Sequence, residues 1–351
     1  ANERRQRSRI FGLGALALSG LFSLFLIIKS FTLKKSGVKP KKEKQLPRNY
    51  DLPRVSPVMA EILDIDNKPS SRSLTAYLME LAVQKRIEID PVKVRRKTYY
   101  KISLTDKDLK DEVPLIRYLF NKVGDGKSFT TYELKKHRSS KLSKIFASWQ
   151  KQKKQEAVSA GFLDKQIESK KDTNLVLMII LLVLSGAGII AAFFSSEGAA
   201  GLFIAAVILI GVAILATIYS NKKLSPYTDK GAEATNQVRG FKKMLDEIGN
   251  FKMREVGELP LWEKIMPYAV ALGVSKKVLK QLKIEFADEI DDANILFWGP
   301  FYSSGQDGFA SNFNSSFNSG ANLNSSASGG SGGFSGGSSG GFGGGSGGGA
   351  F

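Results

Sequence analysis

Three long apolar runs constrain this chain more than any other feature of its sequence. They cover residues 10–28, 175–194 and 201–219, and none contains a charged side chain. A helix of about 20 apolar residues crosses the hydrocarbon core of a bilayer, which is about 30 Å thick. The runs therefore predict three transmembrane helices, and the short connection between the last two predicts an antiparallel hairpin.

The residues that flank the runs predict an orientation. A basic flank, residues 1–9, precedes the first run as it does in signal peptides, but no small-residue cleavage pattern follows Ile28, which favours an uncleaved anchor. Basic residues are concentrated in residues 29–53 and recur after the third run, at Lys222 and Lys223. Because cytoplasmic flanks are enriched in Lys and Arg, we expect a multi-pass protein of the bacterial cell membrane with cytoplasmic middle and C-terminal regions.

The charge balance indicates anionic partners. Lys and Arg number 51 against 33 Asp and Glu, for a formal net charge of +18. Such a surplus favours acidic lipid headgroups, nucleic acid or acidic proteins, and it carries no information about the fold. The chain has no Cys and only one His, His137, which excludes thiolate chemistry and disfavours a metal site. We therefore expect no cofactor and no metal.

The region between the first two runs is predicted to mix helices and strands. Residues 29–53 read as a basic juxtamembrane linker, and residues 54–174 as a cytoplasmic winged-helix-like α+β region. Its first part has a helix and then two strands around a basic loop, at residues 73–83, 87–89 and 98–104. A second copy of this pattern is expected to follow, with helices at residues 113–123, 132–136 and 142–159.

The second copy contains a strongly basic run. Between Leu134 and Gln155 there are eight basic residues and no acidic one: Lys135, Lys136, Arg138, Lys141, Lys144, Lys151, Lys153 and Lys154. Phe146, Trp149 and Val158 are expected to face inward. A surface of this kind can bind phosphates, with an affinity that falls as salt rises. A membrane surface or protein partner is favoured, nucleic acid and a merely solvated face remain open, and His137 is expected to be a surface residue.

The region after the third run, residues 220–300, is predicted to be helical and carries the most specific pattern. Thr228, Gly231, Val238, Gly240, Phe241 and Leu245 are followed by WEKIMPYAVALGV at residues 262–274. The pattern resembles the YciQ-like C-terminal region of a bacterial family of predicted membrane proteins of unknown function. Met266 stands where the family usually has leucine. The resemblance extends from about Pro53 to the C-terminus. Family members often carry a β-rich extracytoplasmic domain before the first span, and we expect it to be absent here.

The signature residues are interpreted as structural, with a ligand site as the alternative. They are Gly240, Phe241, Pro267, Tyr268, Leu272 and Gly273. Pro267 limits or kinks a helix, Tyr268 combines apolar burial with a hydroxyl hydrogen bond, and Gly273 suits a helix C-terminus. A further amphipathic helix is expected over residues 275–284.

The last segment, residues 301–351, consists mostly of Gly, Ser, Asn and Phe. Such a composition buries too little apolar surface to offset the entropy of ordering, so the segment is predicted to be a disordered Gly-rich tail. Its phenylalanines are candidates for weak self-association or partner docking, with a passive tail slightly favoured: Phe309, Phe313, Phe317, Phe334, Phe342 and Phe351.

Together these features predict a mainly α membrane protein with a mixed middle region and a helical C-terminal region. The favoured function is a non-enzymatic scaffold or adaptor in the lipid bilayer that presents basic cytoplasmic regions to protein partners or anionic lipid. The alternative is a membrane-tethered nucleic-acid-binding regulator. An enzyme is disfavoured because no pair of catalytic residues stands out at informative spacing, so no catalytic or cofactor-binding residue is assigned.

Overall fold

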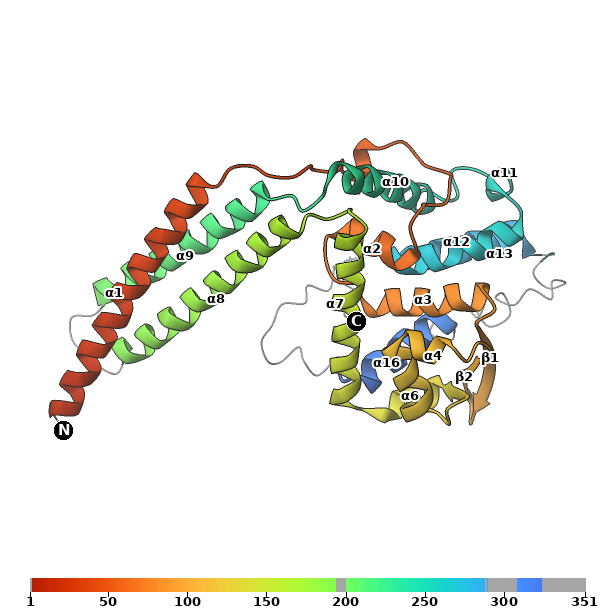
Figure 1. Ribbon diagram of the computed structural model, residues 1–351, viewed down its shortest axis with the longest axis horizontal. Helices are drawn as coiled ribbons and strands as arrows, with labels where there is room; N and C mark the ends of the chain where they lie inside the picture. The colour runs from red at the N-terminus through yellow and green to blue at the C-terminus, as the bar shows by residue number, and fades with distance from the viewer. Residues whose placement is uncertain (1, 194–199, 288, 290–307, 324–351) are drawn as a thin grey trace, which may run out of the picture.

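The computed structural model describes residues 2–193, 200–287, 289 and 308–323. Two parts are visible (Figure 1), which we call the arm and the body. The arm consists of three long helices that lie side by side, α1 (Asn2–Thr32), α8 (Lys165–Phe193) and α9 (Ala200–Lys223). The body contains all the other elements, and α8 and α9 connect directly to it.

The arm has a narrow interior and an apolar exterior. Leu26, Leu181 and Ala213 meet between the three helices, together with buried polar side chains such as Ser23 and Thr217. Many large apolar side chains of the arm instead face outward: Ile10, Leu18, Leu21, Leu24, Phe25, Ile28, Phe31, Leu175, Val176, Ile179, Ile180, Leu182, Val183, Ile204, Val207, Ile208, Val212, Leu215, Ile218 and Tyr219. The arm therefore presents an extended apolar surface.

The prediction of three transmembrane helices is wrong for the part of the chain that the structure describes. There, none of the helices combines the length and the apolar character needed to cross a membrane. The apolar runs at residues 10–28, 175–194 and 201–219 are segments of longer helices with charged ends: α8 opens on Lys165 and α9 closes on Lys222 and Lys223. Residues 194–199, which contain most of the predicted hairpin connection, lie outside the described residues.

The first part of the body follows the predicted order. Before it, residues 33–56 are irregular except for a short 3-10 helix, η1 (Glu43–Gln45). Two helices follow, α2 (Pro57–Ile65) and α3 (Ser71–Val83), and the side chains of Ser56 and Ser70 cap their N-termini. An antiparallel hairpin, β1 (Ile87–Val94) and β2 (Lys97–Leu104), comes next and confirms the predicted strands.

The rest of the middle region forms around the same sheet. Its elements are α4 (Leu109–Glu112), α5 (Pro114–Tyr118), a π-helix η2 (Leu119–Val123), β3 (Ser128–Thr130), α6 (Thr131–His137) and α7 (Ser140–Ser159). The three predicted helices are therefore present, although the first is divided between α5 and η2. β3 pairs with β2 and completes one antiparallel sheet of order β1-β2-β3.

The winged-helix-like architecture is not supported. The predicted pattern is a helix followed by a hairpin in each of two copies, whereas the second segment contributes a single strand, β3, and α7 leads through Gly161 and Leu163 into α8 of the arm. Within the described residues both supposed copies share the one three-stranded sheet. Local helix-then-strand order cannot distinguish a repeated unit from a single sheet assembled from both segments, because strand pairing is non-local.

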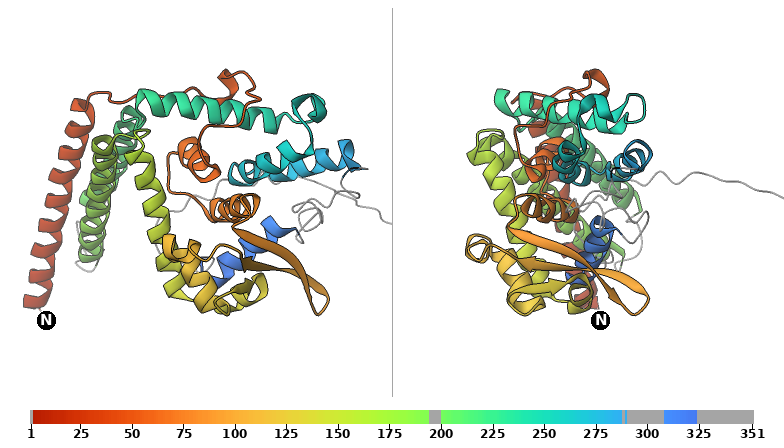
Figure 2. Two further views of the ribbon diagram at one scale, coloured as in Figure 1. Left: turned by 45° about the vertical axis from the view of Figure 1, so that its right-hand side comes forward. Right: turned by 90° about the vertical axis from the view of Figure 1, so that its right-hand side faces the viewer.

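The region after the arm is helical, as predicted. It contains α10 (Asp229–Asp246), α11 (Met253–Val256), α12 (Leu259–Ala271) and α13 (Ser275–Glu285). α10 packs on α2, and α12 packs on both α2 and α3 (Figure 2). These helices and the middle region bury their apolar side chains in one continuous core.

The disordered-tail prediction is wrong for residues 308–323. Residues 309–320 form a helix, α16 (Phe309–Gly320), which lies against α3, α6 and β2. The side chains of Phe309, Phe313 and Phe317 are fully buried. The prediction relied on overall composition. A helix can form an apolar stripe with only one apolar residue in every four, as α16 does. Phe334, Phe342, Phe351 and the rest of the predicted tail lie outside the described residues.

Candidate functional site: a basic surface on α6 and α7

Local signals in the sequence hold α6 and α7 in place. Thr130 and Glu133 form a reciprocal capping box at the start of α6. Arg138 ends α6 in the left-handed region, with φ of 40°, and the side chain of Ser139 then caps α7. Leu134 and Leu142, both buried, anchor the two helices to the core.

Five of the eight basic residues lie on α7, and the helical repeat places them on different faces of the helix. Phe146 and Trp149 face the core, each 3% exposed, which turns Lys141, Lys144 and Lys151 toward solvent. Two other lysines form ion pairs within the protein: Lys153 with Glu156 at an N–O distance of 2.9 Å and Lys154 with Glu168 at 2.7 Å. A run that is continuous in sequence is therefore not continuous on the surface.

The other six residues form what we call the basic surface: Lys135, Lys136, Arg138, Lys141, Lys144 and Lys151. All six are exposed, and in the described part of the chain none makes an ion pair. The ammonium group of Lys136 lies 4.3 Å from the centre of the Tyr132 ring. A hydrogen bond from Lys136 lowers the pKa of the Tyr132 hydroxyl, and the positive charge of Arg95 adds to this shift.

The β1-β2 hairpin adjoins the basic surface. The tip of the hairpin carries Lys93, Arg95, Arg96 and Lys97, all exposed. Close to this tip, the Tyr99 ring meets the Tyr132 ring edge to face, with centroids 5.1 Å apart. The sequence separates the basic loop from the basic helices by more than 30 residues, so only the fold shows that they adjoin.

His137 does not have the simple surface position expected for it. Its Nε2 atom lies 3.0 Å from the Tyr118 hydroxyl, which is also 3.1 Å from the Ser139 hydroxyl. The rings of His137 and Tyr118 contact each other edge to face. The imidazole is thus half-buried and links α6 to α5.

Ion pairs where the arm meets the body were missed by sequence reasoning. Asp66, at the end of α2, pairs with Lys171 of α8 at 2.5 Å. Burial raises the pKa of Asp66, and the charge of Lys171 opposes that shift. Nearby, Asp64 pairs with Arg239 at 3.2 Å and with Lys242 at 2.8 Å. Partners more than 100 residues apart leave no local signal in a single sequence.

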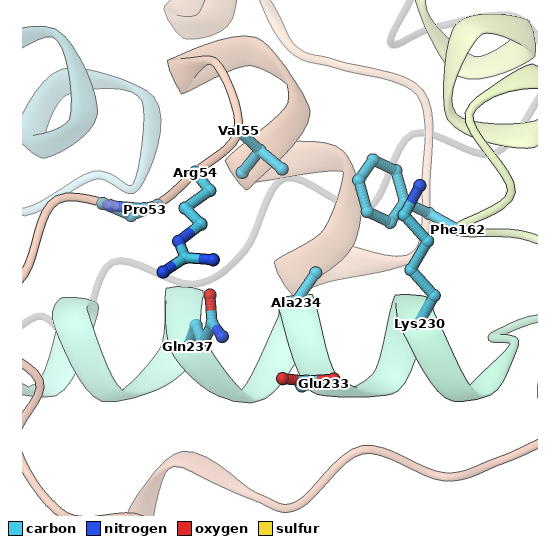
Figure 3. Close-up of a pocket in the computed structure, with 8 residues that line it drawn as sticks. All are labelled: Pro53, Arg54, Val55, Phe162, Lys230, Glu233, Ala234 and Gln237. Carbon is cyan, nitrogen blue, oxygen red and sulfur yellow. The ribbon is translucent and has the colours of Figure 1, made fainter.

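A pocket of about 320 Å³ lies between α10 and the two segments that contain Val55 and Phe162 (Figure 3). Its lining is mixed: Pro53, Arg54, Val55, Phe162, Lys230, Glu233, Ala234 and Gln237. Lys230 is already engaged, because its ammonium group donates to the Ala160 carbonyl at 2.7 Å and lies 4.7 Å from the centre of the Phe162 ring. The exposed Arg54 offers the pocket a cation for an anionic group.

The first signature residues contact the segment that precedes α2. A Cβ at Gly240 would lie 3.0 Å from the Pro47 carbonyl oxygen, so the glycine permits this segment to cross α10 closely. Phe241 is fully buried against the Tyr268 ring. The Tyr268 hydroxyl donates to the Val55 carbonyl at 2.7 Å, and burial raises its pKa to about 12.

The remaining signature residues shape the end of α12. The helix continues through Pro267 to Ala271, and Leu272 caps it. Gly273 follows with φ of +78°, and a Cβ there would lie 2.4 Å from a guanidinium nitrogen of Arg72. Gly273 therefore sits at the helix C-terminus, as predicted, and permits α3 to approach.

A family model described as "Predicted membrane protein (DUF2207) C-terminal domain" matches residues 47–282. The match includes α2 to α12 and most of α13, and therefore the basic surface, the pocket and the signature residues. Neither a curated protein nor a solved structure matches the chain. The resemblance seen in the signature is confirmed, and because the match covers more than half of the chain, the protein belongs to this family of predicted membrane proteins, DUF2207.

Proposed function

We propose that this protein is a membrane-associated, non-enzymatic adaptor whose basic surface binds anionic lipid headgroups. One observation carries the proposal: six exposed cations on α6 and α7 make no ion pair within the described residues, next to a hairpin tip with four more. Each Lys or Arg near an anionic membrane contributes about 1 kcal/mol. Several acting together give useful affinity without a shaped pocket.

The arm supports a location at the membrane. Monomeric soluble proteins rarely expose contiguous apolar patches larger than a few hundred Å², and larger ones mark contacts with proteins or lipid. The arm exposes apolar side chains on all three helices, among them Phe25, Val183 and Leu215. Lysines gather where it joins the body, including Lys34, Lys35 and Lys222. We infer that the arm contacts lipid through this apolar surface while the lysines contact headgroups.

The charge distribution also favours one side of the membrane and one class of function. The cytoplasmic leaflet carries the anionic lipids, so the proposal puts the body on that side. Catalysis requires groups that converge on a reacting atom. The basic surface instead spreads its charge along two helices, which suits electrostatic binding and the presentation of the body to other proteins.

The test uses the full chain and vesicles of phosphatidylcholine with or without phosphatidylglycerol. A triple variant, Lys141→Glu, Lys144→Glu and Lys151→Glu, reverses the charge on α7. A matched control, Lys264→Glu, Lys276→Glu and Lys280→Glu, makes the same change at exposed positions of α12 and α13. We expect the α7 variant to bind anionic vesicles at least about 100-fold more weakly, and the control to retain most of the wild-type affinity. Equal losses in both would contradict a specific surface.

Nucleic acid is the second candidate, favoured by one feature. Arg95 and Arg96 extend from the hairpin beside Tyr99 and Tyr132, and cations near aromatic rings suit a nucleic-acid backbone and bases. Duplex and single-stranded DNA are therefore titrated alongside the vesicles over a range of salt. Preferential, salt-resistant binding to DNA would replace the lipid proposal with this one.

A further inference from the structure

Helix α16 has an unusual amino-acid composition for a helix. Its sequence, FASNFNSSFNSG, has no charged residue and consists largely of Ser, Asn and Phe, which are mediocre helix formers. A helix of 12 residues is marginal in water even with the best composition. The helical state of this segment therefore depends on what it packs against.

The packing comes from three phenylalanines at four-residue spacing. Phe309, Phe313 and Phe317 lie on one face of α16, and each is 0% exposed. Their rings stack along the helix, with centroids 5.7 Å and 6.0 Å apart. Tyr100 of β2 meets Phe309 edge to face at 5.5 Å, and Phe146 of α7 meets Phe317 at 4.9 Å. The face formed by α3, β2, α6 and α7 thus receives all three rings.

Polar contacts fix the register of α16 on this face. The Asn312 amide donates to the Thr98 carbonyl at 3.0 Å and accepts from the Thr131 hydroxyl at 2.6 Å. At the other end, the backbone N–H of Ser139 donates to the Gly320 carbonyl at 2.7 Å. A Cβ at Gly320 would lie 2.2 Å from the carbonyl oxygen of Leu134, so close contact there requires glycine.

The groove and its occupant belong to different parts of the chain. Tyr100, Thr131 and Phe146 lie inside the family-model match at residues 47–282, whereas α16 lies beyond it. The groove is therefore a feature of the matched domain, and α16 is an additional segment that fills it. This arrangement is the helix-in-groove form of peptide recognition, realised within one chain.

We propose that the face formed by α3, β2, α6 and α7 is a helix-binding groove for an uncharged segment with Phe at every fourth position, and that it accepts α16 from a second copy of the chain in exchange for its own. An α16 helix from a second copy makes the same contacts in the groove as the chain's own α16, so exchange loses no contact. Covalent connection favours the cis arrangement through an effective concentration in the millimolar range. Exchange therefore links copies when the local protein concentration is high, as it is on a membrane.

A peptide experiment tests the groove. A labelled synthetic peptide of residues 308–323 is titrated into the full chain and into a full-chain variant with Phe309→Ala, Phe313→Ala and Phe317→Ala. We expect the variant to bind the peptide at least about 100-fold more tightly than the wild type, whose groove is occupied. A Phe313→Ala peptide should lose at least about 10-fold, whereas Ser311→Ala, on the exposed face, should bind like the parent. Equal binding by both proteins, or an unaffected Phe313→Ala peptide, would overturn the groove.

An exchange experiment tests the second copy without emptying the groove. The chain has no Cys, so single cysteines can carry dyes: a donor at Lys135→Cys beside the groove of one copy and an acceptor at Ser311→Cys on α16 of another. Energy transfer between mixed copies should rise with concentration and should fall when unlabelled peptide is added. No intermolecular transfer at millimolar protein, or transfer that the peptide leaves unchanged, would overturn exchange. Neither experiment involves lipid, so a failure of the exchange proposal can be distinguished from a failure of the proposed function.

Discussion

The phenol hydroxyl of Tyr227 donates a hydrogen bond of 2.6 Å to the backbone carbonyl of Leu63. Tyr227 lies just after α9 of the arm and Leu63 lies in α2 of the body, so this bond joins the two parts. Burial raises the pKa of the hydroxyl and keeps it a donor. The same segment also pairs with residues 36–38 and 162–164, where Val38 donates to Tyr227 at 3.0 Å and Asp164 donates to Pro226 at 2.7 Å.

Tyr227→Phe removes this hydrogen bond and keeps the ring. We expect the free energy of unfolding to fall by about 1–2 kcal/mol, because the Leu63 carbonyl loses a buried partner. Urea unfolding of the full chain in detergent measures the change. Tyr219→Phe, at an exposed position of α9, is the control and should leave stability unchanged. A similar loss in both variants would mean that the Tyr227 hydroxyl has no special role.

Gly231→Ala tests the close contact at the same place. A Cβ at Gly231 would lie 1.8 Å from the Phe162 carbonyl oxygen, so the first turn of α10 must move away from residues 161–164. We expect a loss of about 3 kcal/mol or more, as for other overpacked buried sites. Gly211→Ala in α9 has nothing within 4 Å of the new Cβ and should be neutral or slightly stabilising. Thermal unfolding of the two variants compares them, and equal midpoints would contradict this packing.

Glu263→Gln tests a half-buried carboxylate whose only pKa shift comes from burial. Burial alone raises the pKa of Glu263 from its ordinary value of 4.5, and its Oε1 atom has no hydrogen-bond partner. The folded state thus binds the proton more tightly than the unfolded state. Its contribution to stability is greatest below pH 4.5 and declines as the pH rises through the folded pKa.

Neutral glutamine should therefore stabilise the protein at pH 7, by less than about 1 kcal/mol because the group is half exposed. The gain should vanish at pH 4, which urea unfolding at the two pH values measures. Glu255→Gln, an exposed position on α11, is the control and should show no comparable gain. A gain that is independent of pH would contradict the explanation by burial.

Substitutions of Lys154 and Lys151 should distinguish a lysine that stabilises the fold from a lysine that binds anionic lipid. Lys154→Gln leaves the Glu168 carboxylate without its cation at a side-chain exposure of 15%, so we expect a loss of about 1–3 kcal/mol in urea unfolding. Lys151→Gln should leave stability unchanged and weaken binding to anionic vesicles. The reverse pattern would show that the division of the basic run is incorrect.

Local patterns predicted much of the body and little of how its parts meet. Apolar periodicity located α3, α7 and α13, and the glycine and proline pattern of residues 262–274 indicated the family. These are short-range signals. The pairing of β3 with β2 and the ion pair between Asp66 and Lys171 join distant segments, which a single sequence does not reveal.

Two failures had compositional causes. Apolar runs predicted membrane spans because hydropathy ignores where a helix begins and ends, whereas α8 starts on ten mostly polar and charged residues. Low complexity predicted disorder because Ser, Asn and Gly outnumber Phe, whereas three well-spaced rings suffice to dock α16. In the basic run, the inward position of Lys153 follows from its helical phase relative to Trp149, a signal that was present in the sequence.

The most direct test of the account asks which surface faces anionic lipid. A single cysteine at Ser148, which is exposed on the outer face of α7 beside Lys144 and Lys151, carries an environment-sensitive dye in this Cys-free chain. A second protein carries the dye at the exposed Ala287, after α13. We predict that anionic vesicles shift the emission of the Ser148 label and leave the Ala287 label unchanged, while neutral vesicles shift neither. A shift at Ala287 alone, or no shift at Ser148 while the protein binds anionic vesicles, would contradict the role of the basic surface.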